Sequence, residues 1–208
     1  MERLLVSDPA AVPRAAALLA SGGVILYPTD TLYGLGADAL SDEAVAKIYA
    51  IKGRDEKKPM HAIVADVAMA ARYGEMNPLA QKLAEHFLPG PLTLILKKYE
   101  ESNTGIARDI DTFGIRIPDN DFCSALAQAF DRPFTTTSAN VSGAIPARTI
   151  DEIVMQFGAE ASLIDLAIDA GVLPSRTPST IVDASDGTAK ILREGAISVS
   201  DIDSVVLA

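Results

Sequence analysis

The sequence predicts a single α/β domain in which a twisted, mixed β-sheet is flanked by helices. Short apolar runs typical of buried strands alternate with longer segments of helical periodicity along the whole chain. No repeat, low-complexity tract or Pro/Gly/Ser-rich linker divides residues 1–208, a length usual for one domain. Asp186-Gly187, between two late apolar runs, is typical of a hairpin, so the sheet is expected to contain antiparallel pairs.

Helices are expected where a capping side chain precedes a periodic segment and a glycine or proline ends it. Strands are expected at short apolar runs bounded by turn residues. On these criteria the first half contains a helix over 9–21 with Ser7 and Asp8 as caps, a strand over 24–27, a helix over 41–51 started by Ser41, a strand over 60–65, a short helix capped by Asp66, a helix opened by Asn77-Pro78 and broken by Pro89-Gly90-Pro91, and a strand over 92–97.

The second half continues the alternation. Residues 99–112 are polar and weakly patterned, which predicts a mobile loop. Residues 199–206 are compatible with either a helix or a strand. The remaining expected elements are a strand over 113–117, a helix over 119–130, a strand over 133–137, a helix over 149–157 and the two hairpin strands over 179–183 and 189–193.

The composition excludes several functional classes. The chain carries 28 acidic against 18 basic side chains, a net charge of −10, whereas nucleic-acid binding normally needs a basic face. The single cysteine, Cys123, rules out an intramolecular disulfide, and two histidines leave no Cys/His cluster at zinc spacing. No signal-peptide pattern and no apolar run of about 20 residues occurs. We therefore expect a soluble, cytoplasmic protein without a membrane segment or a protein metal site.

Residues 28–37, PTDTLYGLGA, bring hydroxyls, a carboxylate and glycines together directly after a predicted strand. The spacing of Gly34 and Gly36 resembles a dinucleotide fingerprint, but in that motif the glycines form the strand-to-helix turn itself. Six residues separate Tyr27 from Gly34 here, so that interpretation is rejected. A ligand site and a capped turn with tight packing at the glycines both remain open.

Residues 52–59, KGRDEKKP, contain four of the 18 basic residues. Lys52 and Arg54 flank Gly53, so two cations and the backbone can approach one anion together. Arginine offers a planar fork to phosphate or carboxylate, and lysine offers a point charge. Because cations are also favoured near a helix C-terminus, a solvated helix end remains an equal alternative.

Arg116 interrupts an apolar strand with isoleucine on either side, so it either faces solvent or meets an anion. Residues 135–143, TTTSANVSG, lie at and just beyond the end of another strand. Strand C-terminal ends are where open α/β sheets bind ligands, and hydroxyl and amide groups suit sugars, bases or phosphates. An ordinary turn rich in Asn and Ser/Thr caps is the alternative.

Arg193 ends the last predicted strand, shortly before Gly195, in the segment ILREGAI. This is a suitable place for a cation above a cleft, and a hairpin arginine paired with Glu194 is the alternative. The sequence contains no Gly-x4-Gly-Lys-Ser/Thr phosphate loop, no Gly-x-Ser-x-Gly elbow and no kinase signature set. These residues therefore do not predict a covalent protein nucleophile.

Taken together and in order, seven segments resemble the YrdC/Sua5 (TsaC) family of L-threonylcarbamoyladenylate synthases. They are PTDTLYGLGADA, KGRDEKKP, PGPLTLIL, GIRIP, TTTSANVSG, PSTIVD and ILREGAI. The resemblance runs from about residue 10 to about residue 196 and is to the short, single-domain form without the C-terminal domain of longer Sua5 members. It implies a twisted α/β sheet with a deep, positively lined cavity.

The family resemblance implies a nucleotidyltransferase that joins L-threonine, bicarbonate (or CO2) and ATP into threonylcarbamoyl-AMP and pyrophosphate. Mg²⁺ is expected with ATP. Partner proteins then place the threonylcarbamoyl group on adenosine of ANN-decoding tRNAs. The residues implied in nucleotide binding are Lys52, Arg54, Lys58, Ser138, Asn140 and Arg193, of which Lys52 and Arg54 are also expected to be catalytic. The residues implied in threonine binding are Thr31, Thr112, Arg116, Thr136 and Ser179.

One position departs from the family pattern. Longer members often carry a histidine four residues after the proline, where this chain has Ile63. His61 lies two residues earlier, and strand alternation would put both side chains on the same face. His61 either substitutes for the family histidine or faces the surface.

Two other functions remain open. One is a module that binds tRNA or double-stranded RNA in the cavity. The charge counts disfavour it, because residues 1–145 hold 18 acids against 14 bases and residues 146–208 hold 10 against 4. The other is a diverged paralogue that keeps the nucleotide pocket and acts on another amino or carbamoyl substrate, as the departure at Ile63 allows.

Overall fold

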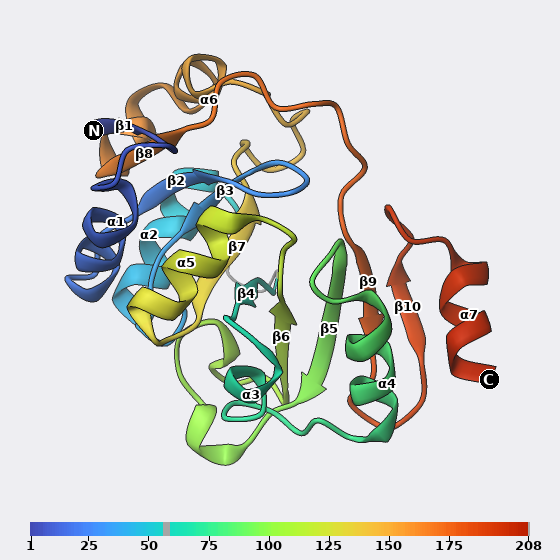
Figure 1. Ribbon diagram of the computed structural model, residues 1–208. Helices are drawn as coiled ribbons and strands as arrows, with labels where there is room; N and C mark the ends of the chain where they lie inside the picture. Colours follow the sequence, from blue (N-terminus) through green and yellow to red (C-terminus); the bar gives the residue numbers. More distant parts are fainter. Residues whose placement is uncertain (56–58, 208) are drawn as a thin grey trace.

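The computed structural model describes residues 1–55 and 59–207, an α/β domain built on one twisted sheet (Figure 1). In this part of the chain ten strands take the order β1-β8-β2-β3-β7-β4-β6-β5-β9-β10. Parallel and antiparallel pairs both occur, which confirms the expected mixed sheet. The strands are β1 (Glu2–Leu5), β2 (Ile25–Pro28), β3 (Tyr33–Gly36), β4 (His61–Ile63), β5 (Leu92–Lys97), β6 (Thr112–Arg116), β7 (Phe134–Ser138), β8 (Leu166–Asp169), β9 (Thr180–Asp183) and β10 (Lys190–Arg193).

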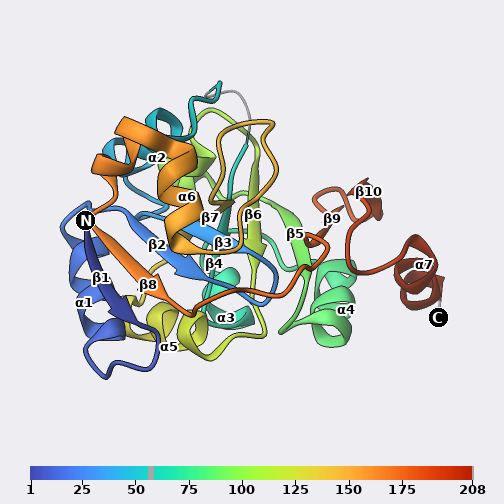
Figure 2. The same ribbon diagram turned by 90° about the horizontal axis from the view of Figure 1, so that it is seen from above.

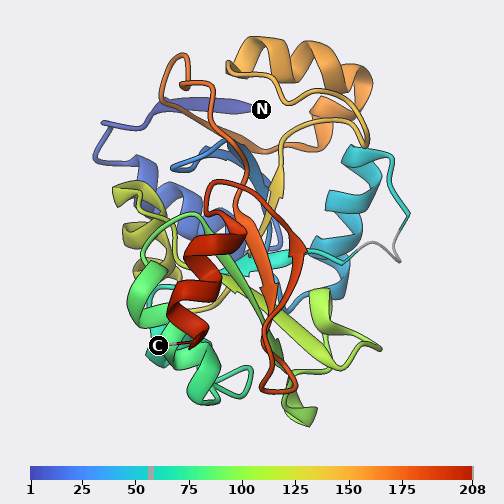
Figure 3. The same cartoon turned by 90° about the vertical axis from the view of Figure 1, so that its right-hand side faces the viewer.

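The helices divide between two apolar clusters on the sheet. Figure 2 shows α1 and α5 on one face and α2 and α6 on the other. Helices α4 and α7 pack together beside the β9–β10 end of the sheet (Figure 3). The described helices are α1 (Ala11–Ala20), α2 (Asp42–Lys52), α3 (Val67–Ala70), α4 (Pro78–Phe87), α5 (Asp121–Phe130), α6 (Ile150–Phe157) and α7 (Val199–Leu207), with short 3-10 helices η1 (Glu100–Ser102), η2 (Gly105–Ala107) and η3 (Gly158–Leu163).

Three of the expected helix caps are confirmed by hydrogen bonds. Ser41, Asp66 and Asn77 each accept a bond from the backbone N–H three residues later, at the starts of α2, α3 and α4. At its C-terminus α2 ends at Gly53, whose φ of 56° lies in the left-handed region that glycine adopts readily. The expected caps of the first helix are wrong, because α1 begins only at Ala11 and has no side-chain cap.

Three strands were not expected from the sequence. Strand β1 is a largely exposed edge strand, and β8 is a four-residue run in a stretch without turn signals. Strand β3 contains Gly34 and Gly36, which pair with β2 and face the ring of Tyr27. A Cβ on Gly36 would lie 2.9 Å from that ring, so the glycines serve tight packing, one of the two alternatives. At the other end of the chain, residues 199–207 are helical.

The segment over 99–112 is more structured than expected. It contains η1 and η2, and Ile106 and Ala107 are buried. The Thr104 hydroxyl donates to the Leu40 carbonyl at 2.7 Å, and the Gly105 N–H donates to the Asp42 carboxylate at 2.8 Å. These bonds anchor the segment to the start of α2. In the described residues, no helix combines the length and apolarity needed to cross a bilayer.

Candidate active site

A cavity of about 540 Å³ is lined by residues of β3, β4, β5, β6, β7, β9 and β10 and of the loops beside them. Its size is in the range of small-molecule sites, roughly 300–1,000 Å³. Ten of the eleven site residues expected from the sequence line this cavity: Thr31, Lys52, Arg54, Thr112, Arg116, Thr136, Ser138, Asn140, Ser179 and Arg193. The eleventh, Lys58, lies outside the described residues. Residues from distant parts of the chain thus face one space.

Lys52, the last residue of α2, is buried with only 3% of its surface exposed. Its ammonium donates to the carbonyls of Ser138 and Asn140, at 2.5 and 2.9 Å. Burial, and then the nearby Arg54 charge, lower the pKa of Lys52 to about 7. Lys52 therefore has two functions open to it: it holds the segment after β7 in place, and it brings a cation to the wall.

Arg54 follows the glycine that ends α2 and is half-buried. One terminal nitrogen donates to the Thr137 hydroxyl at 3.2 Å, and the other donates to the Pro59 carbonyl at 2.9 Å. Its guanidinium also lies 5.6 Å from the centre of the Tyr49 ring. Burial lowers the pKa of Arg54, but an arginine remains charged at neutral pH.

Asn140 presents a fixed hydrogen-bond acceptor to the cavity. Its Nδ2 donates to the carbonyls of Val141 and Ala144, at 2.9 and 2.8 Å, which sets the orientation of the amide. Its Oδ1 is buried without a hydrogen-bond partner among the described residues. A buried acceptor of this kind is expected to meet a donor from a ligand.

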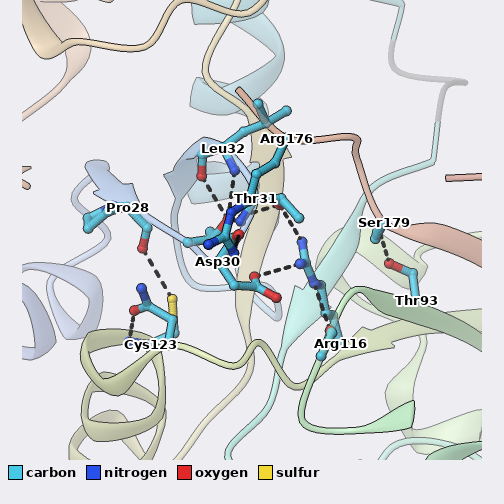
Figure 4. A network of polar contacts seen from close by, with 12 residues as sticks. Pro28, Asp30, Thr31, Leu32, Thr93, Arg116, Cys123, Arg176 and Ser179 are labelled. Atoms are coloured by element: carbon cyan, nitrogen blue, oxygen red, sulfur yellow. Dashed lines mark hydrogen bonds and ion pairs between the residues drawn. The ribbon is translucent and has the colours of Figure 1, made fainter. Parts of the chain in front are cut away.

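Arg116, at the end of β6, belongs to a buried polar network (Figure 4). Its Nη2 bonds the Asp30 carboxylate at 2.6 Å, and its Nη1 donates to the Thr31 hydroxyl at 3.1 Å. Both side chains of the ion pair are 6% exposed. The structure therefore resolves the sequence alternative: Arg116 points into the protein and meets a carboxylate.

Ser179 and Arg193 form a second polar network that lines the cavity. The guanidinium of Arg193 donates to the Ser179 carbonyl through Nε at 3.1 Å and Nη2 at 2.8 Å, and Nη2 also contacts the Ser179 hydroxyl at 3.2 Å. That hydroxyl lies 2.9 Å from the hydroxyl of Thr93. Figure 4 shows the two side chains pointing toward each other. The expected alternative, pairing of Arg193 with Glu194, is not among the ion pairs of the described residues.

His61 lines the cavity, so the alternative of a surface-facing ring is wrong. Its ring packs over Gly114, where a Cβ would lie only 2.4 Å from the His61 Cδ2. Burial lowers the pKa of His61 to about 4, with further contributions from Arg193, Arg54 and Arg116. The ring is therefore neutral at pH 7. Ile63 is fully buried in the cluster beneath α1 and α5.

The sequence prediction missed several polar residues at this site. Asp30, Thr29 and Thr93 lie within the motif segments, but nothing in the sequence marked them as site residues. Their role depends on which side chains the fold brings next to them. Asp183 also lines the cavity, and its carboxylate accepts from the N–H and hydroxyl of Ser185. Cys123 is fully buried in the core.

Fold and site together define a class of protein: an α/β domain with one small cavity walled by cations, hydroxyls and a neutral imidazole. Such a wall suits a compact anion with hydrogen-bonding groups, such as a nucleotide together with a small acid. Lys52 and Arg193 are held by uncharged oxygens, so they retain the capacity to bind phosphate or carboxylate.

The chain belongs to the Sua5/YciO/YrdC family: the family model Sua5_yciO_yrdC, described as "Telomere recombination", matches residues 17–195. Among curated relatives, the chain is 40% identical over 182 residues to a putative threonylcarbamoyl-AMP synthase of Methanocaldococcus jannaschii, covering 88% of this chain and 84% of that protein. It is 38% identical over 192 residues to the threonylcarbamoyl-AMP synthase of Mus musculus, covering 89% and 67%.

Among solved structures, the fold matches P. abyssi Sua5 complexed with L-threonine, with a TM-score of 0.86 and 30% sequence identity. The match covers 99% of this chain and 59% of the Sua5 chain, so the present chain spans about three-fifths of the length of that protein. The similarity to the family that the motifs indicated is thereby confirmed, and so is the α/β fold with its mixed sheet.

Proposed function

We propose that this chain is a threonylcarbamoyl-AMP synthase, which forms threonylcarbamoyl-AMP and pyrophosphate from L-threonine, bicarbonate and ATP. The observation that carries the proposal is that one cavity is lined by Lys52, Arg54 and the Ser138–Asn140 segment together with Arg116 and Ser179. Relatives with this name support it in sequence, and a Sua5 structure complexed with L-threonine supports it in fold.

The nucleotide is proposed to bind along Lys52, Arg54, Ser138 and Asn140, with Arg193 as a further phosphate contact. Lys52 and Arg54 bring two cations to one wall, which suits the charge of a triphosphate. The free Oδ1 of Asn140 accepts a hydrogen bond and cannot donate one, so it suits an amino or hydroxyl group of the nucleoside. Lys58 is proposed to add a further cation from the neighbouring segment.

Threonine is proposed to bind on the side of Thr31, Arg116 and Ser179, with Thr112 and Thr136 nearby. Arg116 makes three bonds here, one from each nitrogen, and two N–H groups on its terminal nitrogens have no bond among the described residues. These two N–H groups suit the threonine carboxylate. The hydroxyls of Thr31 and Ser179 suit the amino and hydroxyl groups of the substrate.

The reaction needs positioning and charge stabilisation more than a protein nucleophile. The neutral amine of threonine adds to CO2 and releases a proton, or it condenses with bicarbonate and releases water, and either route gives a carbamate. A carbamate oxygen then attacks the α-phosphorus of ATP. The bond from that phosphorus to the bridging oxygen breaks, and pyrophosphate leaves with the electron pair. Negative charge grows on the phosphoryl oxygens, which the wall cations stabilise.

Mg²⁺ is proposed to arrive with the nucleotide. Within residues 1–55 and 59–207, no three His, Cys, Asp or Glu side chains lie together in an arrangement that could hold a metal ion. The phosphates themselves would therefore supply most ligands of Mg²⁺, as magnesium commonly retains waters and phosphate oxygens. The product is proposed to pass, in the cytoplasm, to proteins that transfer the threonylcarbamoyl group to tRNA.

Pyrophosphate release tests the proposal when measured with threonine, serine or no amino acid, each with and without bicarbonate. We expect release to require both bicarbonate and an amino acid, and to be fastest with threonine. Serine lacks one methyl group, which typically reduces kcat/KM by about tenfold or more. Release that is indifferent to threonine would refute the proposal. A preference for serine would instead favour a diverged enzyme with another amino substrate.

A further inference from the structure

Asp30 lies at the tip of the β2–β3 turn, and its carboxylate is the ion-pair partner of Arg116. We infer that Asp30 is a positioning residue, which orients the Arg116 guanidinium toward the carboxylate of the amino-acid substrate. The inference rests on the proposed function, in which Arg116 binds threonine. Asp30 does not line the cavity in the described structure, whereas Thr29, Thr31 and Arg116 do. It therefore acts through Arg116 and not on the substrate directly.

Because the ion pair is buried, Asp30 strongly restricts the position of the Arg116 guanidinium. The Arg116 and Asp30 side chains are each 6% exposed, so neither charge is well solvated. A buried arginine without a counter-charge is strongly unfavourable, and its side chain would move toward any oxygen or toward water. The 2.6 Å bond to Asp30 removes that freedom at one end of the guanidinium.

The other contacts of Arg116 complete its orientation. The Nη1 donates to the Thr31 hydroxyl at 3.1 Å, and Nε approaches the Gly90 carbonyl at 3.5 Å. Three nitrogens thus meet three separate partners, which fixes the plane of the guanidinium. Because Asp30 is the charged partner, it supplies the strongest of these bonds.

Asp30 is itself held in place from two directions (Figure 4). The hydroxyl of Thr29 accepts from the N–H groups of Thr31 and Leu32 and donates to the Leu32 carbonyl, which closes the turn around Asp30. Arg176, on the connection between β8 and β9, donates to the Asp30 carbonyl at 2.8 Å. A carboxylate on so well-tied a backbone is suited to orient another side chain.

The substitution Asp30→Asn tests this role, because asparagine has the same shape and can still accept one bond but has no charge. We expect the KM for threonine to rise tenfold or more, while the KM for ATP changes less than threefold. Asp30→Glu is the second variant: it keeps the charge but displaces the carboxylate by one methylene. A fivefold or greater rise in threonine KM is expected there as well.

Asp38→Asn is the matched control. The Asp38 carboxylate is also 6% exposed and also pairs with an arginine, Arg132, at 2.7 Å. It does not line the cavity in the part of the chain that the structure describes. The same chemical change at Asp38 should leave the KM for threonine and the KM for ATP within twofold of the wild type.

An NMR measurement tests positioning without activity. In the wild type the terminal N–H groups of Arg116 should give separate signals because rotation of the guanidinium is restricted, and in Asp30→Asn these signals should merge. If wild-type release depends on threonine but both Asp30 variants keep the wild-type KM, the inference is overturned and the proposed function stands. If wild-type release ignores threonine, the proposed function fails, and unchanged Arg116 signals in Asp30→Asn overturn the inference separately.

Discussion

The cations on the outer surface and the cations on the cavity wall are held by different partners. Outside, Arg3, Arg14 and Arg72 each bond a carboxylate, with side chains between 43% and 47% exposed. Inside, Lys52 and Arg193 are held by backbone carbonyls and a hydroxyl. A carbonyl orients a cation without cancelling its full charge, so the inner cations remain able to bind anions.

Arg116 lies between these two arrangements, because it is on the cavity wall and yet pairs with a carboxylate. This comparison explains how a chain of net charge −10 can present a cationic cavity. The surface acids neutralise surface bases, whereas Lys52 and Arg193 reach the cavity wall held by backbone carbonyls and a hydroxyl.

The largest effect is expected from Arg116→Met, which leaves the Asp30 carboxylate buried without its cation. Removing one partner of a buried ion pair typically costs about 3–5 kcal/mol. The free energy of unfolding, measured by urea denaturation at pH 7, should fall by that amount. The double variant Asp30→Asn/Arg116→Met removes both charges and should recover at least half of the loss. If Arg116→Met were as stable as the wild type, Arg116 and Asp30 would not form a buried ion pair in solution.

Lys52→Met should reduce kcat/KM for ATP by about 100- to 1,000-fold, a loss typical of removing one group that stabilises a transition-state charge. Lys47→Met is the matched control. Lys47 lies on the same helix, also donates to a carbonyl, that of Gly22 at 2.7 Å, and is exposed on the surface. It should retain activity within twofold. If Lys52→Met keeps more than a tenth of wild-type kcat/KM, Lys52 does not contribute to stabilising the transition state.

A smaller effect is expected for the pH dependence of stability that His61 causes. The pKa of His61 is lowered to about 4 in the folded protein, against 6.5 ordinarily. The unfolded chain therefore binds more protons between pH 6.5 and 4, and the folded state loses stability as the pH falls through this range. Relative to His61→Gln, wild-type stability should fall by up to about 1.4 kcal/mol per pH unit. Parallel curves would show that burial in the cavity does not lower the pKa of His61.

The smallest effect is expected for an ion pair on the outer surface. Arg14 bonds Glu2 at 2.8 Å, and both side chains are well exposed. Exposed pairs of this kind contribute about 0–1 kcal/mol, and salt screens them. Arg14→Ala should therefore change the free energy of unfolding by less than about 1 kcal/mol and leave pyrophosphate release unchanged. A larger loss of stability would show that exposed ion pairs contribute to the free energy of unfolding as much as the buried ones do.

Much of the fold could be predicted because its signals are local. Ser41 and Asn77 cap helices through bonds to residues three positions away, and the run at 92–97 is a strand of the expected length. Strand β3 was missed because its glycines have low strand propensity, and only the Tyr27 ring across the sheet explains them. The edge strand β1 was missed because it lacks alternation, and its identity comes from pairing with β8, over 160 residues away.

By itself, the sequence determined the class of fold, the order of the motifs and the residue types available for binding an anion. Those features depend on short-range periodicity, capping and composition. Only the tertiary structure decided that Lys52, Arg116 and Arg193 line one cavity, that His61 turns inward, and that Asp30 is the partner of Arg116. Strand order and burial select these partners, because a charged side chain removed from water bonds whatever polar group the fold brings within reach.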